Sequence, residues 1–290
     1  MRRHFWCLFL ILLAGSPLTH GQESCGTSLW LQQLEAARPG IRADMEAIEQ
    51  STSAWIQQHA EGQASRSIVT IPVVVHVLYN TPEQNISDEQ ILSQIQILNE
   101  DYRRQNADRV KTPAIFLDVA ADCGIEFVLA KQDPQGNATN GITRTATQAL
   151  VFQMGNFMKR PETGGKSAWD TQKYLNIWVC NLNPGLLGYA SVPGSELAAY
   201  DGVVLTYKAF GKGGTTVSPY NLGRTATHEV GHWLNLQHIW GDNDGADPCS
   251  GTDNVPDTPN QAERNEGCPS FPHPSCGNIS DMFMNYMDYV

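Results

Sequence analysis

The chain has 290 residues, which is enough to bury a substantial hydrophobic core in one or two domains. Hydrophobic residues make up 41% and charged residues 17%, which excludes a wholly disordered or collagen-like chain. The formal net charge of -11 argues against a nucleic-acid-binding protein that relies on phosphate contacts, so we expect no nucleic-acid partner. It suits a secreted protein or one that acts on basic substrates.

The first residues of the chain have the pattern of a secretory signal peptide. Arg2 and Arg3 precede an apolar run from Phe5 to Ala14, and small and turn-forming residues follow as far as Gly21. The alternative is a membrane anchor, but this run is about ten residues long, whereas about 20 are needed to cross a bilayer. We therefore expect residues 1–21 to be removed and the rest of the chain to be secreted and extracellular, without membrane association.

Residues 22–66 differ in character from those that follow. Helix-favouring stretches occupy Leu29 to Ala37 and Ala43 to Gln58, and β-branched clusters are almost absent. The sequence therefore predicts a separate helical segment ahead of the main domain.

The main domain is predicted to combine strands and helices. β-branched residues crowd the stretch from Ile68 to Leu78, which is typical of a buried strand. Ser87 and Gln90 form a capping box before an amphipathic helix whose apolar residues recur up to Tyr102. Further strands are predicted in three stretches: 125–130, 174–180 and 202–207. These elements favour an α/β (α+β) fold with a twisted mixed sheet and packed helices.

The strongest chemical signal is the sequence His-Glu-Val-Gly-His at 228–232, followed by His238. On a helix, His228 and His232 face the same way, so two imidazoles can hold one Zn²⁺ while Glu229 faces an adjacent open position. Three histidines and a water complete the tetrahedral coordination of a catalytic zinc. Zinc lowers the pKa of its water, and Glu229 can take the proton as general base and later deliver it to a leaving amine. This chemistry is peptide-bond hydrolysis without a covalent intermediate.

Two other interpretations of these histidines are a surface helix that carries them by chance and a structural zinc site. A structural site normally takes four protein ligands and has no use for a glutamate beside the metal. His238 lies ten residues beyond His228, so it can reach the metal only if the helix ends and the chain turns sharply near Asn235. Asparagine tolerates the left-handed conformation that such a helix exit requires.

The stretch 228–238 resembles the extended zinc signature of the metzincin metallopeptidases, His-Glu-x-x-His-x-x-Gly-x-x-His, with Asn235 where most members have Gly. That substitution occurs in the pappalysin family, whose ulilysin-like (cytophagalysin-type) branch this chain resembles over nearly all of residues 67–290. The segment around Met287 and Tyr289 is similar to the family's Met-turn. The resemblance implies that Met287 forms an apolar floor under the zinc ligands and that Tyr289 helps to stabilise the oxyanion.

For the fold, the resemblance implies a cleft with a five-stranded mixed sheet and its helices above it, and an irregular lower subdomain. Gly188, Tyr189 and Ala190 are expected in the edge strand that pairs with an extended protein or peptide substrate. A preference for Arg or Lys next to the scissile bond is also implied. We therefore expect a secreted zinc-dependent endopeptidase, a hydrolase that acts as a monomer.

Residues 22–66 fit a pro-segment that keeps such an enzyme latent as a zymogen. Cys25 is the one cysteine of this segment, and a thiolate is a suitable fourth zinc ligand that would displace the catalytic water. The alternative is an unpaired cysteine or one in a disulfide. Arg66 and Ser67 resemble the site at which ulilysin-like precursors are cut, so we expect activation cleavage between them.

A loop over residues 241–276 is rich in Asp, Asn, Gly, Pro and Cys and has little periodicity, so it needs support other than a hydrophobic core. Its oxygen-bearing side chains suit Ca²⁺, and the resemblance favours a calcium site within 253–258. A solvated acidic loop is the alternative. We expect Asp242, Asp253 and Thr258 among the calcium ligands.

Disulfides can persist in an exported protein, and six of the seven cysteines lie outside the expected signal peptide. We expect Cys249 and Cys276 to pair across the acidic loop. Cys123 and Cys180 are either buried thiols or a bridge. The family continues beyond the position of Val290 with acidic residues, a cysteine and a terminal helix, so the C-terminus looks truncated by comparison.

Two alternative functions remain open at this point. If the family's C-terminal residues are required, the chain would be a catalytically impaired protein that binds zinc and calcium. An adhesin or inhibitor module would instead keep binding its partner after zinc had been removed. A peptidase assay with Glu229→Ala as the control distinguishes both from an active endopeptidase.

Overall fold

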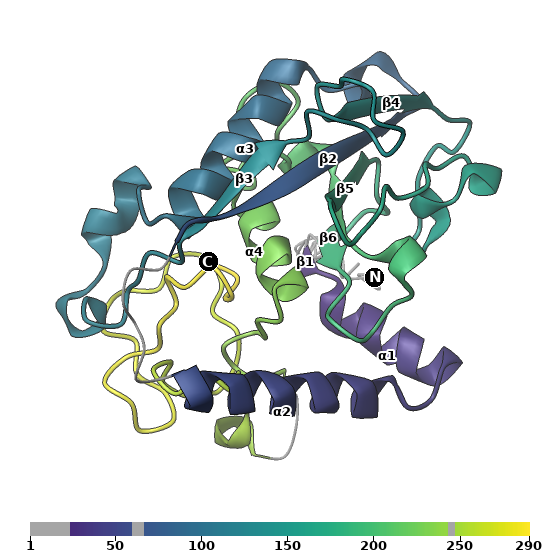
Figure 1. Ribbon diagram of the computed structural model, residues 1–290. Coiled ribbons are helices and arrows are strands. Elements are labelled where there is room, and N and C mark those ends of the chain that lie inside the picture. The colour runs from purple at the N-terminus through teal and green to yellow at the C-terminus, as the bar shows by residue number, and fades with distance from the viewer. Residues whose placement is uncertain (1–23, 60–66, 243–246) are drawn as a thin grey trace, which may run out of the picture.

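The structure is a computed structural model that describes residues 24–59, 67–242 and 247–290 (Figure 1). The expected signal peptide and Arg66 lie outside these residues. Within the described part of the chain, no helix has both the length and the apolar character needed to cross a membrane.

A twisted, mostly parallel sheet forms the centre of the fold. The strand order is β1-β6-β7-β5-β2-β3, and β4 also pairs with β2. β6 runs antiparallel to β7, whereas β2, β3, β4, β5 and β7 run parallel to one another. The strands are β1 (Ser24–Cys25), β2 (Val69–Tyr79), β3 (Ile125–Leu129), β4 (Ile142–Ala146), β5 (Leu175–Cys180), β6 (Leu186–Ala190) and β7 (Val203–Thr206).

The described residues form seven strands, whereas the resemblance implies five. One of the two additional strands arises because β3 and β4 occupy the same edge of β2 in succession, at Val69 to Val73 and at Val75 to Tyr79. β5 pairs with the middle of β2 and therefore lies on its other side. The second addition is β1, which extends the sheet beyond β6. The expected mixed sheet is thus confirmed. β3 and β4 together fill one strand position beside β2, and β1 is a short sixth strand at the edge.

The sheet has an apolar layer on each face. Val73, Val75 and Val77 of β2 are fully buried in the layer formed with α3 and α4. Leu78 and Trp178 belong to the apolar cluster of the opposite face, because successive side chains of a strand alternate between its faces. The second layer also contains Trp30 from the N-terminal segment.

Two helices pack on the first face of the sheet. α3 (Asp88–Tyr102) begins as predicted, with the Ser87 hydroxyl accepting a hydrogen bond from Gln90 N–H. α4 (Arg224–Trp233) carries the histidine motif, and its residues Ala226 and Val230 are buried against the sheet. The rear of α4 is therefore held by the hydrophobic core.

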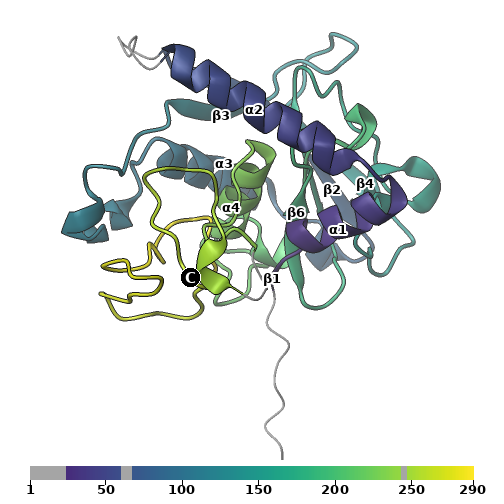
Figure 2. The same cartoon turned by 90° about the horizontal axis from the view of Figure 1, so that it is seen from below.

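Residues 24–59 contain the two helices predicted for the N-terminal segment, α1 (Thr27–Ala37) and α2 (Ile41–His59). β1 leads directly into α1 beside β6 in both views (Figures 1 and 2). Arg38 donates a hydrogen bond to Ser195 O at 2.8 Å, and Asn235 donates one to Glu49 of α2 at 3.0 Å. The segment is thus packed on the main domain at several points.

The described chain after α4 contains neither α-helix nor strand and forms the irregular lower part of the molecule, yellow-green to yellow in Figure 1. A disulfide joins Cys249 and Cys276, 27 residues apart in sequence. Short 3₁₀ helices complete the fold: η1 (Pro82–Gln84), η2 (Ala107–Lys111), η3 (Ala114–Phe116), η4 (Phe157–Lys159), η5 (Pro161–Thr163), η6 (Ala198–Tyr200), η7 (Tyr207–Ala209) and η8 (Pro248–Ser250).

Candidate metal centre and active site

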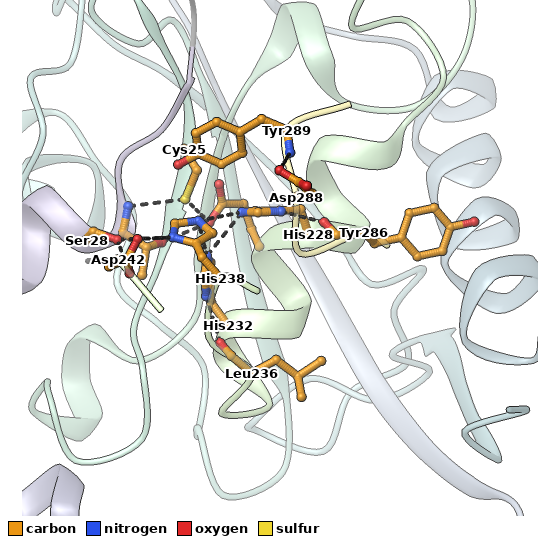
Figure 3. Close-up of polar contacts among 12 residues, drawn as sticks. Cys25, Ser28, His228, His232, Leu236, His238, Asp242, Tyr286, Asp288 and Tyr289 are labelled. Atoms are coloured by element: carbon orange, nitrogen blue, oxygen red, sulfur yellow. Dashed lines mark hydrogen bonds and ion pairs between the residues drawn. The ribbon is translucent and has the colours of Figure 1, made fainter. Parts of the chain in front are cut away.

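Three histidine side chains converge beside α4. His228 and His232 project from the helix, and His238 returns from the segment beyond it (Figure 3). All three are buried. The Nε2 atoms of His228 and His232 are 3.1 Å apart, those of His232 and His238 are 3.1 Å apart, and those of His228 and His238 are 3.2 Å apart. The structure therefore brings the three predicted zinc ligands to one point.

The turn that returns His238 is a Schellman motif at the end of α4. Asn235 adopts the predicted left-handed conformation, with φ 76°. Its N–H donates to His232 O, and Leu236 N–H donates to Gly231 O, both at 2.9 Å. These are the two hydrogen bonds that define the motif, with asparagine at the position that glycine usually takes.

The outer ring nitrogens determine which atoms face the point of convergence. His228 Nδ1 donates to Tyr286 O at 2.6 Å, and His232 Nδ1 donates to Leu236 O at 2.8 Å. Because a carbonyl can only accept, these Nδ1 atoms carry the protons, and the Nε2 lone pairs of the neutral rings point at one another. This arrangement is repulsive unless a cation lies between the nitrogens. Tetrahedral zinc, with Zn–N about 2.0–2.1 Å, needs nitrogens about 3.3 Å apart, so the site fits zinc.

His238 is oriented by a carboxylate. Its Nδ1 lies 2.6 Å from Asp242 Oδ1, and Ser28 of α1 donates to Asp242 Oδ2 at 2.7 Å. Trp240 stacks on the His238 ring with a centroid separation of 4.2 Å. A carboxylate behind a histidine fixes the tautomer and orientation of a metal ligand. The structure thus places Asp242 beside a zinc histidine, whereas the sequence led us to expect it among the calcium ligands.

Glu229 is fully buried next to the histidines. Its Oε2 accepts hydrogen bonds from Thr27 Oγ1 at 3.0 Å and from Cys25 Sγ at 3.5 Å. Its Oε1 has no hydrogen-bond partner among the described residues. Burial raises the pKa of Glu229 to about 8, although these two hydrogen bonds oppose the shift. A carboxyl group whose pKa is near neutrality is suited to take up and release a proton.

Cys25 lies where the histidines converge. It is not in a disulfide, and its Sγ and the three histidine ligand atoms all lie within 4.8 Å of one another. Strand β1 holds it there, because Cys25 pairs with Gly188 of β6. Burial raises the pKa of the Cys25 thiol, and the nearby Glu229 charge raises it further, whereas zinc deprotonates a thiol that coordinates it. One sulfur and three imidazole nitrogens form a donor set typical of zinc.

The two predicted Met-turn residues lie next to the same histidines. Met287 is buried beneath α4, and a Cβ added to Gly231 would lie 2.5 Å from its sulfur. The Tyr289 ring centroid is 5.7 Å from that of His228 and 5.1 Å from that of His238. Burial raises the pKa of Tyr289, so its hydroxyl keeps its proton and can donate a hydrogen bond.

The remaining predicted residues lie apart from the metal centre. Asp253 is buried and accepts a hydrogen bond from Val255 N–H at 3.0 Å, and burial raises its pKa. The Thr258 side chain hydrogen-bonds to Asp253. Ser67 is exposed, immediately before β2, and its predicted cleavage partner Arg66 is outside the described residues.

Several residues of this site could not be identified from sequence patterns. Thr27 and Ser28 contact Glu229 and Asp242 from more than 200 positions away in the chain, as separations of 202 and 214 show. No local pattern encodes such contacts. Trp240 and Tyr286 lie within or beside the motif segments, but neither occupies a motif position.

Comparisons with known proteins identify the family of this chain. The family model described as "Pregnancy-associated plasma protein-A" (Peptidase_M43) matches residues 162–290. An extracellular metalloprotease of Pyricularia oryzae is 31% identical over 298 aligned positions, which cover 97% of this chain and 87% of that protein. One from Arthroderma benhamiae is 32% identical over 228 positions, covering 76% of this chain and 70% of that protein.

Two solved structures resemble this one closely. Mature mirolysin of Tannerella forsythia in complex with a cleaved peptide has a TM-score of 0.75 at 58% identity, covering 78% of this chain and 85% of that chain. A mutant of promirolysin from the same organism has a TM-score of 0.82 at 51% identity and covers 92% of this chain and 86% of that chain. The chain therefore belongs to the pappalysin-like Peptidase_M43 family and is a zinc metalloendopeptidase.

Proposed function

We propose that the protein is made as a secreted zymogen, that Glu229 is the general base of its mature form, and that residues 22–66 keep it latent. The observation that carries this proposal is the position of the Glu229 carboxylate. It lies beside three converging imidazoles and is covered, in this structure, by Cys25 and Thr27 of the N-terminal segment.

Zinc held by His228, His232 and His238 would supply Lewis acidity, which polarises the scissile carbonyl and makes water easier to deprotonate. Glu229 accepts one proton from the attacking water as the water oxygen bonds to the carbonyl carbon. When the C–N bond breaks, Glu229 delivers that proton to the leaving amine. The unpaired Oε1 of Glu229 supports this role, because it leaves one carboxylate oxygen available to the attacking water.

Tyr289 is proposed to stabilise the oxyanion that develops on the carbonyl oxygen. Its ring lies beside those of His228 and His238. Its raised pKa keeps the hydroxyl a donor throughout the physiological range. A hydrogen bond that strengthens as negative charge develops lowers the barrier of this reaction.

Peptides are proposed to bind along β6. β1 pairs with β6 at Leu186 and Gly188, so it covers the outer edge of the strand to which an extended peptide would add. Mirolysin, which shares the fold, has been solved with a cleaved peptide. The pro-segment and a substrate would therefore compete for one edge, and latency follows from that competition together with the Cys25 thiolate as fourth zinc ligand.

Activation is proposed to occur between Arg66 and Ser67. α2 ends at His59 and β2 begins at Val69, so this bond lies between the pro-segment and the first strand of the catalytic domain, residues 67–290. The family resemblance supports a preference for basic residues next to the scissile bond, which would allow self-cleavage.

The test is a peptidase assay on the full chain with an Arg-containing peptide, before and after incubation with a trace of trypsin that is inactivated with a serine-protease inhibitor before the assay. We expect activity to appear together with a new N-terminus at Ser67. Removing zinc with a chelator should abolish the activity, and added zinc should restore it. Glu229→Ala is the matched control, because it keeps the three histidines. Equal activity of this variant and the wild type would refute the assignment of Glu229.

We also propose a structural Ca²⁺ ion at Asp253 and Thr258. The support is the burial of the Asp253 carboxylate in a loop without regular structure. A calcium-selective chelator should lower the melting temperature of the zinc-loaded protein, and an unchanged melting temperature would remove this site.

Export and a monomeric state complete the proposal. The pattern of residues 1–21 and the extracellular relatives support export. Recovery of the protein from the medium with an N-terminus after residue 21, and a monomeric mass in light scattering, would test the two statements separately.

A further inference from the structure

Tyr286 links the metal centre to helix α3. Its main-chain carbonyl accepts the 2.6 Å hydrogen bond from His228 Nδ1. Its ring points away from the histidines (Figure 3), and its hydroxyl donates to Asp101 Oδ1 of α3 at 3.0 Å. One residue therefore contacts a zinc ligand with its backbone and a distant helix with its side chain.

Asp101 of α3 is bound by side chains from two other parts of the fold, the Met-turn and the start of α4. Besides Tyr286, it accepts a 2.6 Å hydrogen bond from Thr227 Oγ1 and forms a 2.8 Å ion pair with Arg224. The Asp101 side chain is 1% exposed, so its charge depends on these partners for solvation. α3, the start of α4 and the Met-turn are thus joined at one buried carboxylate.

Arg224 completes the cluster. Its guanidinium donates to the Tyr286 hydroxyl, lies 4.9 Å from the centre of the Tyr286 ring and also pairs with Asp108 at 3.1 Å. Arg224 is the first residue of α4, four positions before His228. Asp101 therefore binds both the start of α4, the helix that carries two of the proposed zinc ligands, and Tyr286, whose carbonyl orients His228.

Packing alone does not hold Tyr286 in place. The segment around it has no helical or strand hydrogen bonds. Asp101, Tyr286 and Met287 also line an open pocket of about 460 Å³, so one side of the Met-turn lacks close neighbours. The hydrogen bonds from Tyr286 to Asp101 and from Arg224 to Tyr286 therefore restrain this segment, as regular structure and close packing do elsewhere.

We infer that Asp101, Arg224 and Tyr286 form a positioning network that holds the Tyr286 carbonyl against His228 and thereby sets the affinity of the site for zinc. This inference rests on the zinc site of the proposed function. The carbonyl keeps the proton on His228 Nδ1 and the lone pair of Nε2 aimed at the metal. Outer partners of this kind typically change metal affinity about 10- to 100-fold when they are removed.

The test measures the zinc dissociation constant of the full chain by competition with a chromophoric chelator. Tyr286→Phe removes the hydroxyl but keeps the ring and the carbonyl. Tyr102→Phe is the matched control, because Tyr102 OH donates to Thr227 O at 3.0 Å and this hydrogen bond joins α3 to α4 without involving a Met-turn residue. Melting temperatures of the zinc-free proteins report the purely structural cost of each change.

We expect Tyr286→Phe to weaken zinc binding about 10-fold or more and Tyr102→Phe to change it less than about twofold, at similar melting temperatures. Equal dissociation constants for the two variants would overturn the inference. Asp101→Asn, which keeps the acceptor but loses the charge, should weaken zinc binding as well. If that variant does not fold, the two phenylalanine variants still decide the question.

Failure of this inference is distinguishable from failure of the proposed function. Glu229→Ala should abolish hydrolysis and leave the zinc dissociation constant within about threefold of the wild type, since Glu229 is not a proposed ligand. An active Glu229→Ala variant would refute the catalytic assignment, whatever the tyrosine variants show.

Discussion

Thr27 of the pro-segment is hydrogen-bonded to Glu229, the proposed catalytic base. Its hydroxyl donates to Glu229 Oε2 at 3.0 Å and accepts a 3.0 Å hydrogen bond from Ala190 N–H at the end of β6. Thr27 is 1% exposed. The segment that carries Cys25 therefore also occupies the proposed base and one backbone donor of β6, the proposed substrate-binding strand.

Thr27→Val should weaken latency, because valine keeps the shape of threonine but can make neither hydrogen bond. The lost hydrogen bonds leave buried polar groups unpaired, which costs about 1–3 kcal/mol and corresponds to a roughly 5- to 150-fold larger undocked fraction. The measurement is hydrolysis of a peptide by the unprocessed chain, with Arg66→Gln in every protein to prevent activation. Thr52→Val, at an exposed position of α2, is the control.

Cys25→Ala should give a larger increase in the same assay, since it removes the proposed fourth zinc ligand. If Thr27→Val were as latent as the control while Cys25→Ala was active, latency would depend on the thiolate alone. The hydrogen bond from Thr27 to Glu229 would then not contribute to latency.

The sequence predicts the parts of this site that local geometry encodes. The spacing of His228 and His232 fixes their common face on α4, and Asn235 marks the left-handed exit that returns His238. Ser87 likewise marks the start of α3. Each of these features depends on residues within about ten positions of one another, where backbone geometry limits the possibilities.

Contacts between distant segments were not predictable in the same way. Strand β1 has two residues, too few for any periodicity, and its pairing with β6 depends on the docking of the whole pro-segment. Asp242 follows the zinc helix in an acidic loop, so its composition favours calcium, whereas the fold turns it onto His238. Amino-acid composition alone cannot distinguish a carboxylate that binds calcium from one that orients a histidine.

Lys159 is a buried cation that the sequence does not mark. Its side chain lies under the sheet beside Trp178, and its ammonium donates to Tyr200 O at 2.6 Å. Burial lowers the pKa of Lys159 to about 8 from its ordinary value of 10.5. Lys159 therefore loses its proton at a lower pH in the folded protein than in the unfolded chain.

The stability of the fold should consequently rise with pH relative to Lys159→Met. A lysine whose pKa is lowered on folding contributes its full stability above pH 10.5 and loses it as the pH falls through about 8. Between these values the wild type should gain up to about 1.4 kcal/mol per pH unit over the methionine variant. Urea unfolding of both proteins at pH 7.5 and pH 10 measures this, and a pH-independent difference would show that Lys159 does not titrate on unfolding.

The disulfide between Cys249 and Cys276 should stabilise the irregular subdomain chiefly by restricting the unfolded chain. It closes a loop with a sequence separation of 27, for which the chain-entropy model gives about 3–4 kcal/mol. Replacing both cysteines with serine should lower the free energy of unfolding by up to that amount. Cys268→Ser, at an exposed free cysteine, is the control and should change it by less than about 0.5 kcal/mol.

Gly231 and Met287 should show strong energetic coupling. A Cβ at Gly231 would lie 2.5 Å from the Met287 sulfur, so Gly231→Ala must displace the side chain that lies beneath the histidines. We expect this variant to lose about 1–2 kcal/mol of stability despite the higher helix propensity of alanine. Met287→Ala should cost about 2–4 kcal/mol by leaving a cavity.

In the double variant the new methyl group occupies part of that cavity, so the combined loss of stability should be smaller than the sum of the two single losses by about 1 kcal/mol or more. Additive losses in a double-mutant cycle would mean that Met287 does not restrict position 231, and that the glycine at this position has another cause.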